Sequence, residues 1–265
     1  MQKIVAVTLS LLAFLPLLSH AGVSMDLVTT NASGKETGRL NFLAEADKIR
    51  MDDKSDGSRN SMIFLGDSFI VLDHERKNYI VMDEAFVNEV SAEMSDAMKE
   101  MEKQLASLPP DQRAMAEQMM KGRMGQMMGQ QQEAPAPRVE SMGAGNWQDF
   151  DCEKFAVYEG GEKTQELCAA KLSDIDGAAE MMQAFRGMAS FMTKMVESMP
   201  MRANVGVNPG ELMDQIQGFP VHTIDYSNGT AVGETSLESI TEQDLDDGLF
   251  AVPDGYKRED PMRRR

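Results

Sequence analysis

Residues 60–82 read NSMIFLGDSFIVLDHERKNYIVM, the clearest structural signal in the chain. Three apolar runs of four residues, at 62–65, 69–72 and 79–82, are separated by segments rich in Gly, Asp, Ser and Asn. Short runs rich in Ile, Val and Phe that are bounded by turn residues are typical of β-strands. The stretch therefore predicts three consecutive strands joined by tight turns.

The alternation of apolar and polar residues extends back to Val23. Apolar residues two positions apart point to the same face of a strand. Such sets recur between turn-like clusters, and they are Val23/Met25/Leu27, Leu40/Phe42 and Ile49/Met51. Residues 23–82 therefore predict a β-meander of five or six strands.

A change of period after Met82 predicts a helical arm inserted between strands. Apolar residues now recur every three or four positions, as on one face of a helix. They are Val87, Val90, Met94, Met98, Met101 and Leu105. Pro109 and Pro110 end this helix, a second methionine-bearing helix follows, and a Gln-, Ala- and Pro-rich linker completes an arm at residues 84–137.

The rest of the chain predicts further strands and a third long helix. Residues 138–172 are strand-like, and Asp174 or Asp176 is expected to cap a helix that ends at Pro200. A short helix is expected after Pro209, and Asn228-Gly229 between two strand-like runs predicts a hairpin. We expect one domain over residues 22–258 and a disordered tail over 259–265.

The first 21 residues have the features of a secretory signal peptide. Lys3 precedes an apolar run at 4–18, and Ser19-His20-Ala21 fits the small-x-Ala pattern of a cleavage site. The run is shorter than the roughly twenty residues that span a bilayer, and no comparable run follows it. We therefore expect cleavage after Ala21 and a periplasmic protein without a transmembrane segment.

Two cysteines, Cys152 and Cys168, flank a predicted hairpin whose turn is Gly160-Gly161. Folding about this turn brings the cysteines nearly opposite each other, and exported proteins commonly oxidise such pairs. A redox or metal-binding pair would usually have C-x-x-C spacing, which is absent. The sequence predicts a Cys152–Cys168 disulfide.

Charge and motif content exclude several classes of function. The net charge of −17 repels phosphate backbones and anionic lipids, so we expect no nucleic-acid partner. Gly66-Asp67-Ser68 resembles the serine block of a lipase and esterase family, but Ser68 leads into a strand-like run and no Asp-x-x-His motif follows. His74 and His222 have no catalytic partner at a recognisable spacing, so we expect neither an enzyme nor a cofactor.

The chain has 24 methionines in 265 residues, most of them on the three predicted long helices. Methionine is flexible and polarizable, so a seam at three- and four-residue spacing favours an apolar groove. The candidate groove residues are Met94, Met98, Met101, Met181, Phe185, Met188, Met192 and Met195. Thioether sulfur also suits Cu(I) and Ag(I), and the alternative metal ligands are Met115, Met119, Met120 and Met124.

Four short blocks carry a resemblance to a known family. They are residues 48–52, residues 69–72 with 77–82, the run Gly218-Phe219-Pro220-Val221, and Leu249-Phe250 followed by Pro253-x-Gly255-Tyr256. Together they resemble an uncharacterised family of exported bacterial proteins that is similar to the outer-membrane lipoprotein carrier and lipoprotein-sorting superfamily.

This resemblance implies an α+β fold, in which a curved antiparallel β-sheet, or half-barrel, has amphipathic helices against its concave face. In the better-known relatives that cavity holds acyl chains, and the family supplies no catalytic residues. The methionine-rich arm at 84–137 departs from those relatives.

We therefore expect a non-enzymatic periplasmic protein that binds an apolar small molecule, such as a lipid or acyl chain, between the sheet and the methionine-bearing helices. Each buried CH₂ group of such a ligand contributes about 0.8 kcal/mol. Two alternatives remain open: binding of a soft metal ion, and docking of an unidentified protein partner on the helical arm.

Overall fold

The computed structural model describes residues 22–55, 57–109, 112–113, 137–198 and 209–260. Its strands are β1 (Gly22–Asn31), β2 (Glu36–Glu45), β3 (Lys48–Asp53), β4 (Asn60–Phe64), β5 (Phe69–Asp73), β6 (Asn78–Met82), β7 (Arg138–Trp147), β8 (Phe150–Glu159), β9 (Glu162–Ala170), β10 (Phe219–Ser227), β11 (Thr230–Gln243) and β12 (Lys257–Arg258). Its helices are α1 (Glu84–Ser107), α3 (Ala178–Ser198) and α4 (Pro209–Gln215), with the 3₁₀ turns η1 (Leu172–Asp174) and η2 (Asp247–Phe250). The predicted signal peptide lies outside the described residues.

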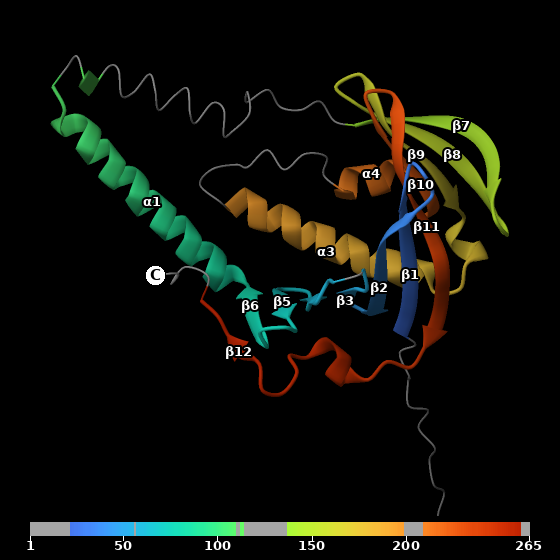
Figure 1. The fold of residues 1–265 in the computed structure, drawn as a ribbon, viewed down its shortest axis with the longest axis horizontal. Helices are drawn as coiled ribbons and strands as arrows, with labels where there is room; N and C mark the ends of the chain where they lie inside the picture. The colour runs from blue at the N-terminus through green and yellow to red at the C-terminus, as the bar shows by residue number, and fades with distance from the viewer. Residues whose placement is uncertain (1–21, 56, 110–111, 114–136, 199–208, 261–265) are drawn as a thin grey trace, which may run out of the picture.

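The described strands form one open sheet in the order β12-β6-β5-β4-β3-β2-β1-β11-β10-β9-β8-β7. Strands β1–β6 and β7–β11 are two antiparallel meanders, and pairing of β1 with β11 joins them. The first meander confirms the predicted strands of residues 23–82. Because the sheet curves around α3 (Figure 1), the α+β half-barrel is also confirmed.

The predicted arm connects the two ends of this sheet, because β6 lies next to the edge strand β12 and β7 is the edge strand at the opposite end. Helix α1 begins after Asp83, whose carboxylate accepts a hydrogen bond from the backbone N–H of Phe86 at 2.9 Å. The helix then runs away from β6 (Figure 1), which confirms the first predicted helix. The second arm helix, with Met115, Met119, Met120 and Met124, lies outside the described residues.

Helix α3 lies on the concave face and completes the main core. Its fully buried Met181 belongs to the same apolar cluster as Met25 of β1 and Phe42 of β2. Further along, the ring of Phe191 packs at centroid distances of 5.7 Å and 5.4 Å from Phe64 and Phe69. Apolar side chains of α3 therefore hold the helix against the first meander.

The start of α3 differs from the prediction, which placed a cap at Asp174 or Asp176. The helix begins at Ala178, and the carbonyl of Gly177 accepts the first bond from the N–H of Met181 at 3.1 Å. Gly177 has a φ of 80°, and a Cβ there would lie 3.0 Å from the side chain of Val23. The aspartate assignment was wrong because the turn needs a residue that tolerates positive φ and close contact with β1.

The outer face of β3–β6 is covered by the segment that follows β11. Phe250 is buried against Ile63 and Leu72, while Leu249 and Tyr256 pack at the edge of this second cluster. The segment ends in β12, which pairs in parallel with β6, and the N–H of Glu259 still bonds to the carbonyl of Tyr79. The backbone contacts between this segment and β6 thus include Glu259.

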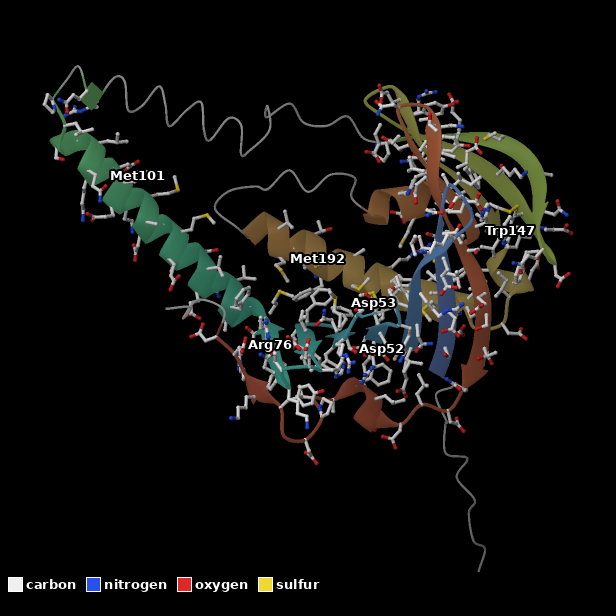
Figure 2. All side chains as sticks on the ribbon, viewed as in Figure 1. Asp52, Asp53, Arg76, Met101, Trp147 and Met192 are labelled. Atoms are coloured by element: carbon white, nitrogen blue, oxygen red, sulfur yellow. A yellow bond between two sulfur atoms is a disulfide. The ribbon has the colours of Figure 1, made fainter. Side chains whose placement is uncertain are left out.

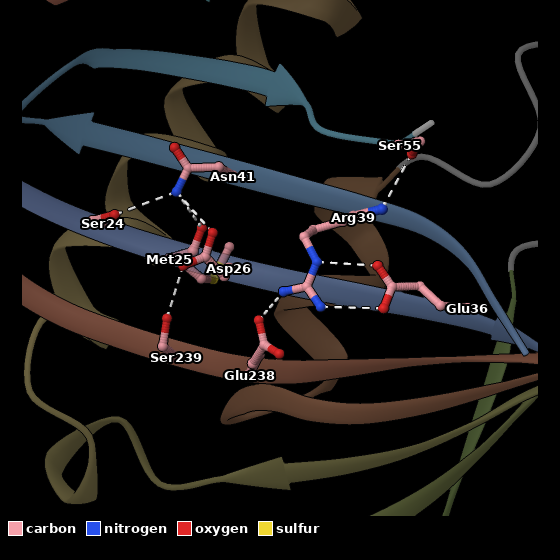
Figure 3. Close-up of polar contacts among 9 residues, drawn as sticks. All are labelled: Ser24, Met25, Asp26, Glu36, Arg39, Asn41, Ser55, Glu238 and Ser239. Carbon is pink, nitrogen blue, oxygen red and sulfur yellow. Dashed lines mark hydrogen bonds and ion pairs between the residues drawn. The ribbon is translucent and has the colours of Figure 1, made fainter. Parts of the chain in front are cut away.

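The outer face of β1, β2 and β11 is polar (Figure 3). Asn41 donates to Asp26 at 2.9 Å, Ser239 donates to the other oxygen of Asp26 at 2.9 Å, and Arg39 pairs with both Glu36 and Glu238. These side chains alternate along the strands with Met25 and Phe42, which face the core. The sheet therefore has one solvated face and one apolar face in this region.

Both predicted hairpins of the second meander are confirmed. Asn228 and Gly229 have φ angles of 51° and 74°, as a two-residue type I′ turn requires. Across the β8–β9 hairpin, Cys152 and Cys168 form the predicted disulfide, with their Cα atoms 5.4 Å apart. The two cysteines are diagonal neighbours in the register, because Cys168 pairs with Lys154.

Candidate functional site

An apolar cavity of about 210 Å³ opens between the sheet and helices α3 and α4. It is lined by side chains from β1, β9, β10, both helices and the loop between α4 and β10: Met25, Leu27, Leu167, Met182, Phe185, Leu212, Met213, Ile216, Gly218, Phe219 and Pro220. None of these residues is charged. Such a cavity can bind an apolar group but offers little to orient a polar one.

Two local features position the walls of this cavity. The ring of Phe185 packs edge-on against Phe42, with 5.4 Å between centroids, which fixes the first half of α3 over β2. A Cβ at Gly218 would lie 2.7 Å from the carbonyl oxygen of Ala170, so only glycine lets this loop approach β9 so closely. Gly218-Phe219-Pro220, one of the blocks that carried the family resemblance, thus lines the cavity.

The eight predicted groove residues are spread over different environments. Phe185 lines the cavity, Met181 and Met195 are buried in the core, and Met188 packs at its margin. Met192 is 41% exposed on α3. Met94, Met98 and Met101 lie on α1, where Met98 and Met101 are each 37% exposed, and Met101 stands well away from β6 (Figure 2).

Sequence reasoning missed most of the cavity wall. Met182 follows a predicted seam residue directly, and Leu212, Met213 and Ile216 have the three- and four-residue spacing of a helix face. This spacing is the signal that could have indicated a buried face on the short helix expected after Pro209. It could not indicate that the face would meet Leu27 and Leu167, which are far away in the sequence.

A second, polar hollow of about 410 Å³ lies on the outer face of β3–β5. At its base Ser61 donates to Asp52, the Nε2 atom of His74 lies 2.6 Å from the Ser61 hydroxyl, and the Nδ1 atom of His74 lies 2.6 Å from the hydroxyl of Tyr256. Arg50 bonds to Asp52 at 2.9 Å and to the carbonyl of Leu249 at 2.8 Å. These contacts tie the C-terminal segment to the sheet.

The order of these contacts differs from that of a catalytic triad. In a triad the carboxylate orients the histidine, and the histidine accepts the serine proton. Here the single proton of Ser61 goes to Asp52, so the Nε2 atom of His74 donates to Ser61 and does not accept its proton, while the Nδ1 atom is within hydrogen-bond distance of the Tyr256 hydroxyl. Ser61 is also only 4% exposed. The cluster therefore works as a clamp on residues 249–256.

Acidification should weaken this clamp. Burial raises the pKa of Asp52, but the hydrogen bond from Ser61 and the charge of Arg50 outweigh burial and hold the pKa below its usual 3.8. A depressed folded-state pKa stabilises the fold above pH 3.8, and this contribution is lost as the pH falls through the folded-state value. We expect Asp52→Asn to lower the free energy of unfolding at pH 7, with a difference from wild type that shrinks below pH 4.

Urea unfolding at pH 7, 5, 4 and 3 measures that difference. Asp67→Asn is the matched control, because Asp67 is exposed at the β4–β5 turn. A difference for Asp52→Asn that stays constant from pH 7 to pH 3 would contradict the clamp.

Ser68 lies in the β4–β5 turn, where its carbonyl accepts from the N–H of Leu65 at 3.0 Å and its hydroxyl donates to Asp67. The strand-like reading of the residues after it is thus confirmed by β5. Among the described residues, His, Cys, Asp and Glu nowhere form a group of three suited to a metal ion. The four alternative methionine ligands are outside that part of the chain.

No helix in the described part of the chain is both long enough and apolar enough to cross a membrane.

Comparisons with known proteins give one family and several distant structural likenesses. A family model described as a domain of unknown function, DUF4412, matches residues 82–256. No curated protein matches the sequence.

Among solved structures, an uncharacterised conserved protein from Thermus thermophilus aligns over 91% of both chains, with 8% identity and a TM-score of 0.44. The MucA/MucB complex of Pseudomonas aeruginosa aligns over 88% of this chain and 56% of that chain, with 8% identity and a TM-score of 0.39. A LolA superfamily protein from Nitrosomonas europaea aligns over 89% of this chain and 91% of that chain, with 9% identity and a TM-score of 0.31. The predicted membership of an uncharacterised family is confirmed, and likenesses this distant say nothing about function.

Proposed function

Because the chain belongs to the DUF4412 family, a domain of unknown function, its activity must be argued from its own geometry, and we propose that it is a non-enzymatic binding protein for an apolar ligand such as an acyl chain. The observation that carries this proposal is the cavity of about 210 Å³ between the sheet, α3 and α4, whose described lining residues carry no charged side chain.

The size of the cavity suits one segment of a chain. Pockets for drug-sized ligands usually enclose about 300–1,000 Å³. This cavity is smaller, but Met182 and Met213 in its wall are unbranched side chains that can change rotamer to accept a longer ligand. Each buried CH₂ contributes about 0.8 kcal/mol, so a chain segment of several carbons would bind measurably.

The polar hollow is a weaker candidate for the ligand site. Its most buried charges, on Asp52 and Arg50, are paired with each other and with Ser61, and they hold the C-terminal segment in place. A ligand there would have to replace contacts that the fold uses.

An exported location is part of the same proposal. The signal-peptide pattern of residues 1–21 supports export, and the Cys152–Cys168 disulfide suits an oxidising compartment such as the periplasm. An apolar cargo in that compartment needs a protein that shields it from water.

Filling the cavity should weaken ligand binding. The probe is N-phenyl-1-naphthylamine, an uncharged dye whose fluorescence rises in an apolar site, with palmitic acid as the competitor. We expect the wild-type protein to bind the dye and palmitic acid to displace it. Leu27→Trp and Leu212→Trp place a large side chain in the cavity and should each weaken dye binding by at least about tenfold.

Val232→Trp is the matched control, because Val232 is 48% exposed on β11 and does not line the cavity. Dye binding by this variant should equal that of the wild type. The proposal fails if the wild-type protein does not bind the dye, or if all three tryptophan variants bind it equally well. Native mass spectrometry of protein purified without detergent then identifies any ligand that is retained.

A further inference from the structure

Helix α1 presents an apolar stripe whose middle, at Met98 and Met101, is exposed in the described structure. Val87, at the start of the helix, is its only buried residue, and residues 96–104 are exposed on every side. At 100° per residue, Met94, Met98, Met101 and Leu105 fall within about 60° of one another. A helix of this kind is stable mainly when its apolar face is packed, so the stripe indicates a missing partner.

The geometry of the stripe fits another helix. Two rows of side chains with seven-residue spacing, Val87/Met94/Met101 and Ser91/Met98/Leu105, run side by side along α1. Seven-residue spacing is the pattern by which two helices pack along a seam. From Met94 to Leu105 the stripe extends for about 16 Å at 1.5 Å per residue, so a partner helix of at least about 12 residues would cover it.

The charges beside the stripe select the partner. Helix α1 carries six acidic residues and two lysines. Both lysines lie toward the back of the helix, where Lys99 pairs with Asp96 and Lys103 with Glu100. Glu102 borders the stripe on one side and has no cationic partner among the residues described. On the other side Ala97 and Gln104 border it, and Glu93 lies one step further round. The surface beside the stripe is therefore negative overall, and Glu102 is its nearest carboxylate.

We infer that the methionine stripe of α1 is a docking surface for a basic amphipathic helix of a partner protein. Methionine side chains adapt to the apolar seam of such a helix, and Glu102 together with the net negative charge of α1 attracts its flanking lysines or arginines. A second copy of this chain would bring two negatively charged α1 helices together, and an anionic lipid surface would be repelled. This surface is separate from the cavity, so the inference does not depend on the proposed function.

The test uses a synthetic peptide of three heptads with leucine at positions a and d and lysine at e and g, labelled for fluorescence anisotropy with the purified protein. We expect the peptide to bind, and a version with glutamate at e and g not to bind. Met98→Ser/Met101→Ser removes exposed side chains only, so folding is kept, and it should raise the Kd by about tenfold or more.

Two charge reversals separate the effect of the rim carboxylate from that of the overall charge. Glu102→Lys, beside the stripe, should raise the Kd by at least about tenfold. Asp96→Lys changes the net charge equally on the back of α1 and should change the Kd by less than about threefold. Circular dichroism checks that each variant keeps its helix content.

Three results would overturn the inference. One is a wild-type protein that does not bind the lysine peptide, and another is an equal loss of binding for the two charge-reversed variants. The third is a Kd that the serine variant leaves unchanged. If the wild-type protein fails to bind the peptide, two measurements identify another occupant of the stripe. A dimer that sedimentation detects for the wild type but not for the serine variant would assign the stripe to a second copy of the chain. Peptide binding that appears only in a variant lacking residues 114–136 would assign the stripe to that segment.

Discussion

Phe64→Ala should lower the free energy of unfolding by about 3–5 kcal/mol, the range for a buried phenylalanine replaced by alanine. Phe64 is 1% exposed, and its ring lies 5.1 Å from that of Phe69 and 5.7 Å from that of Phe191. The substitution removes one of three mutually packed rings that link β4 and β5 to α3. For a chain of this size the Tm should fall by about 10 °C.

Urea unfolding followed by circular dichroism gives the free energies. The control is Val232→Ala, at an exposed position, which should change stability by less than about 0.5 kcal/mol. A loss below about 1 kcal/mol for Phe64→Ala would show that α3 does not pack on the first meander as described. Dye binding measured on the same variant then reports whether the cavity depends on this end of α3, since Met182 and Phe185 lie nearer the other end.

Local patterns predicted the elements of this fold well. The alternation of Val23, Met25 and Leu27 reflects one face of β1 against the core, and the Asn228-Gly229 turn has the φ angles that its composition requires. Both signals act within a few residues, where backbone preferences and the side-chain period dominate. The start of α3 was placed incorrectly because contact between Gly177 and Val23 is a tertiary effect.

Long-range pairing is what the sequence could not supply. Nothing in the local pattern indicates that β1 pairs with β11, or that the chain after Met82 leaves one end of the sheet and returns at the other. The cavity depends on that pairing, because Leu27 of β1 and Leu167 of β9 lie in the same sheet only once the two meanders join. The same holds for the clamp, in which Tyr256 is 182 residues from His74.

The methionine seam shows how far periodicity alone can go. Met181, Met188, Met192 and Met195 fit one helical spacing, yet their exposed fractions range from 0% for Met181 to 41% for Met192. Spacing identifies the apolar face of a helix, but burial depends on what that face meets. On α3 most of the face meets the sheet. On α1 most of it meets nothing described, which is why the same pattern serves as core in one helix and as a candidate docking surface in the other.

Removal of the disulfide by Cys152→Ala/Cys168→Ala should cost about 3 kcal/mol. The two cysteines are 16 residues apart, and closing a loop of about that length restricts the unfolded chain by roughly this amount in the chain-entropy model. Both cysteines are buried in the main cluster, so alanine keeps the site apolar and leaves only a small void. A reducing agent should destabilise the wild-type protein by a similar amount and leave the double variant unchanged.

The position of the bridge in the sheet predicts where the loss is felt. Hydrogen exchange should accelerate most in β7, β8 and β9, because β7 pairs with β8 alone among the described strands, and the disulfide joins β8 to β9. Amides of β3–β5, on the far side of the β1–β11 junction, should exchange at nearly the wild-type rate. An equal acceleration in both meanders would mean that the two meanders unfold as one unit. The disulfide would then stabilise the whole sheet by restricting the unfolded chain, and it would have no local effect on β7, β8 and β9.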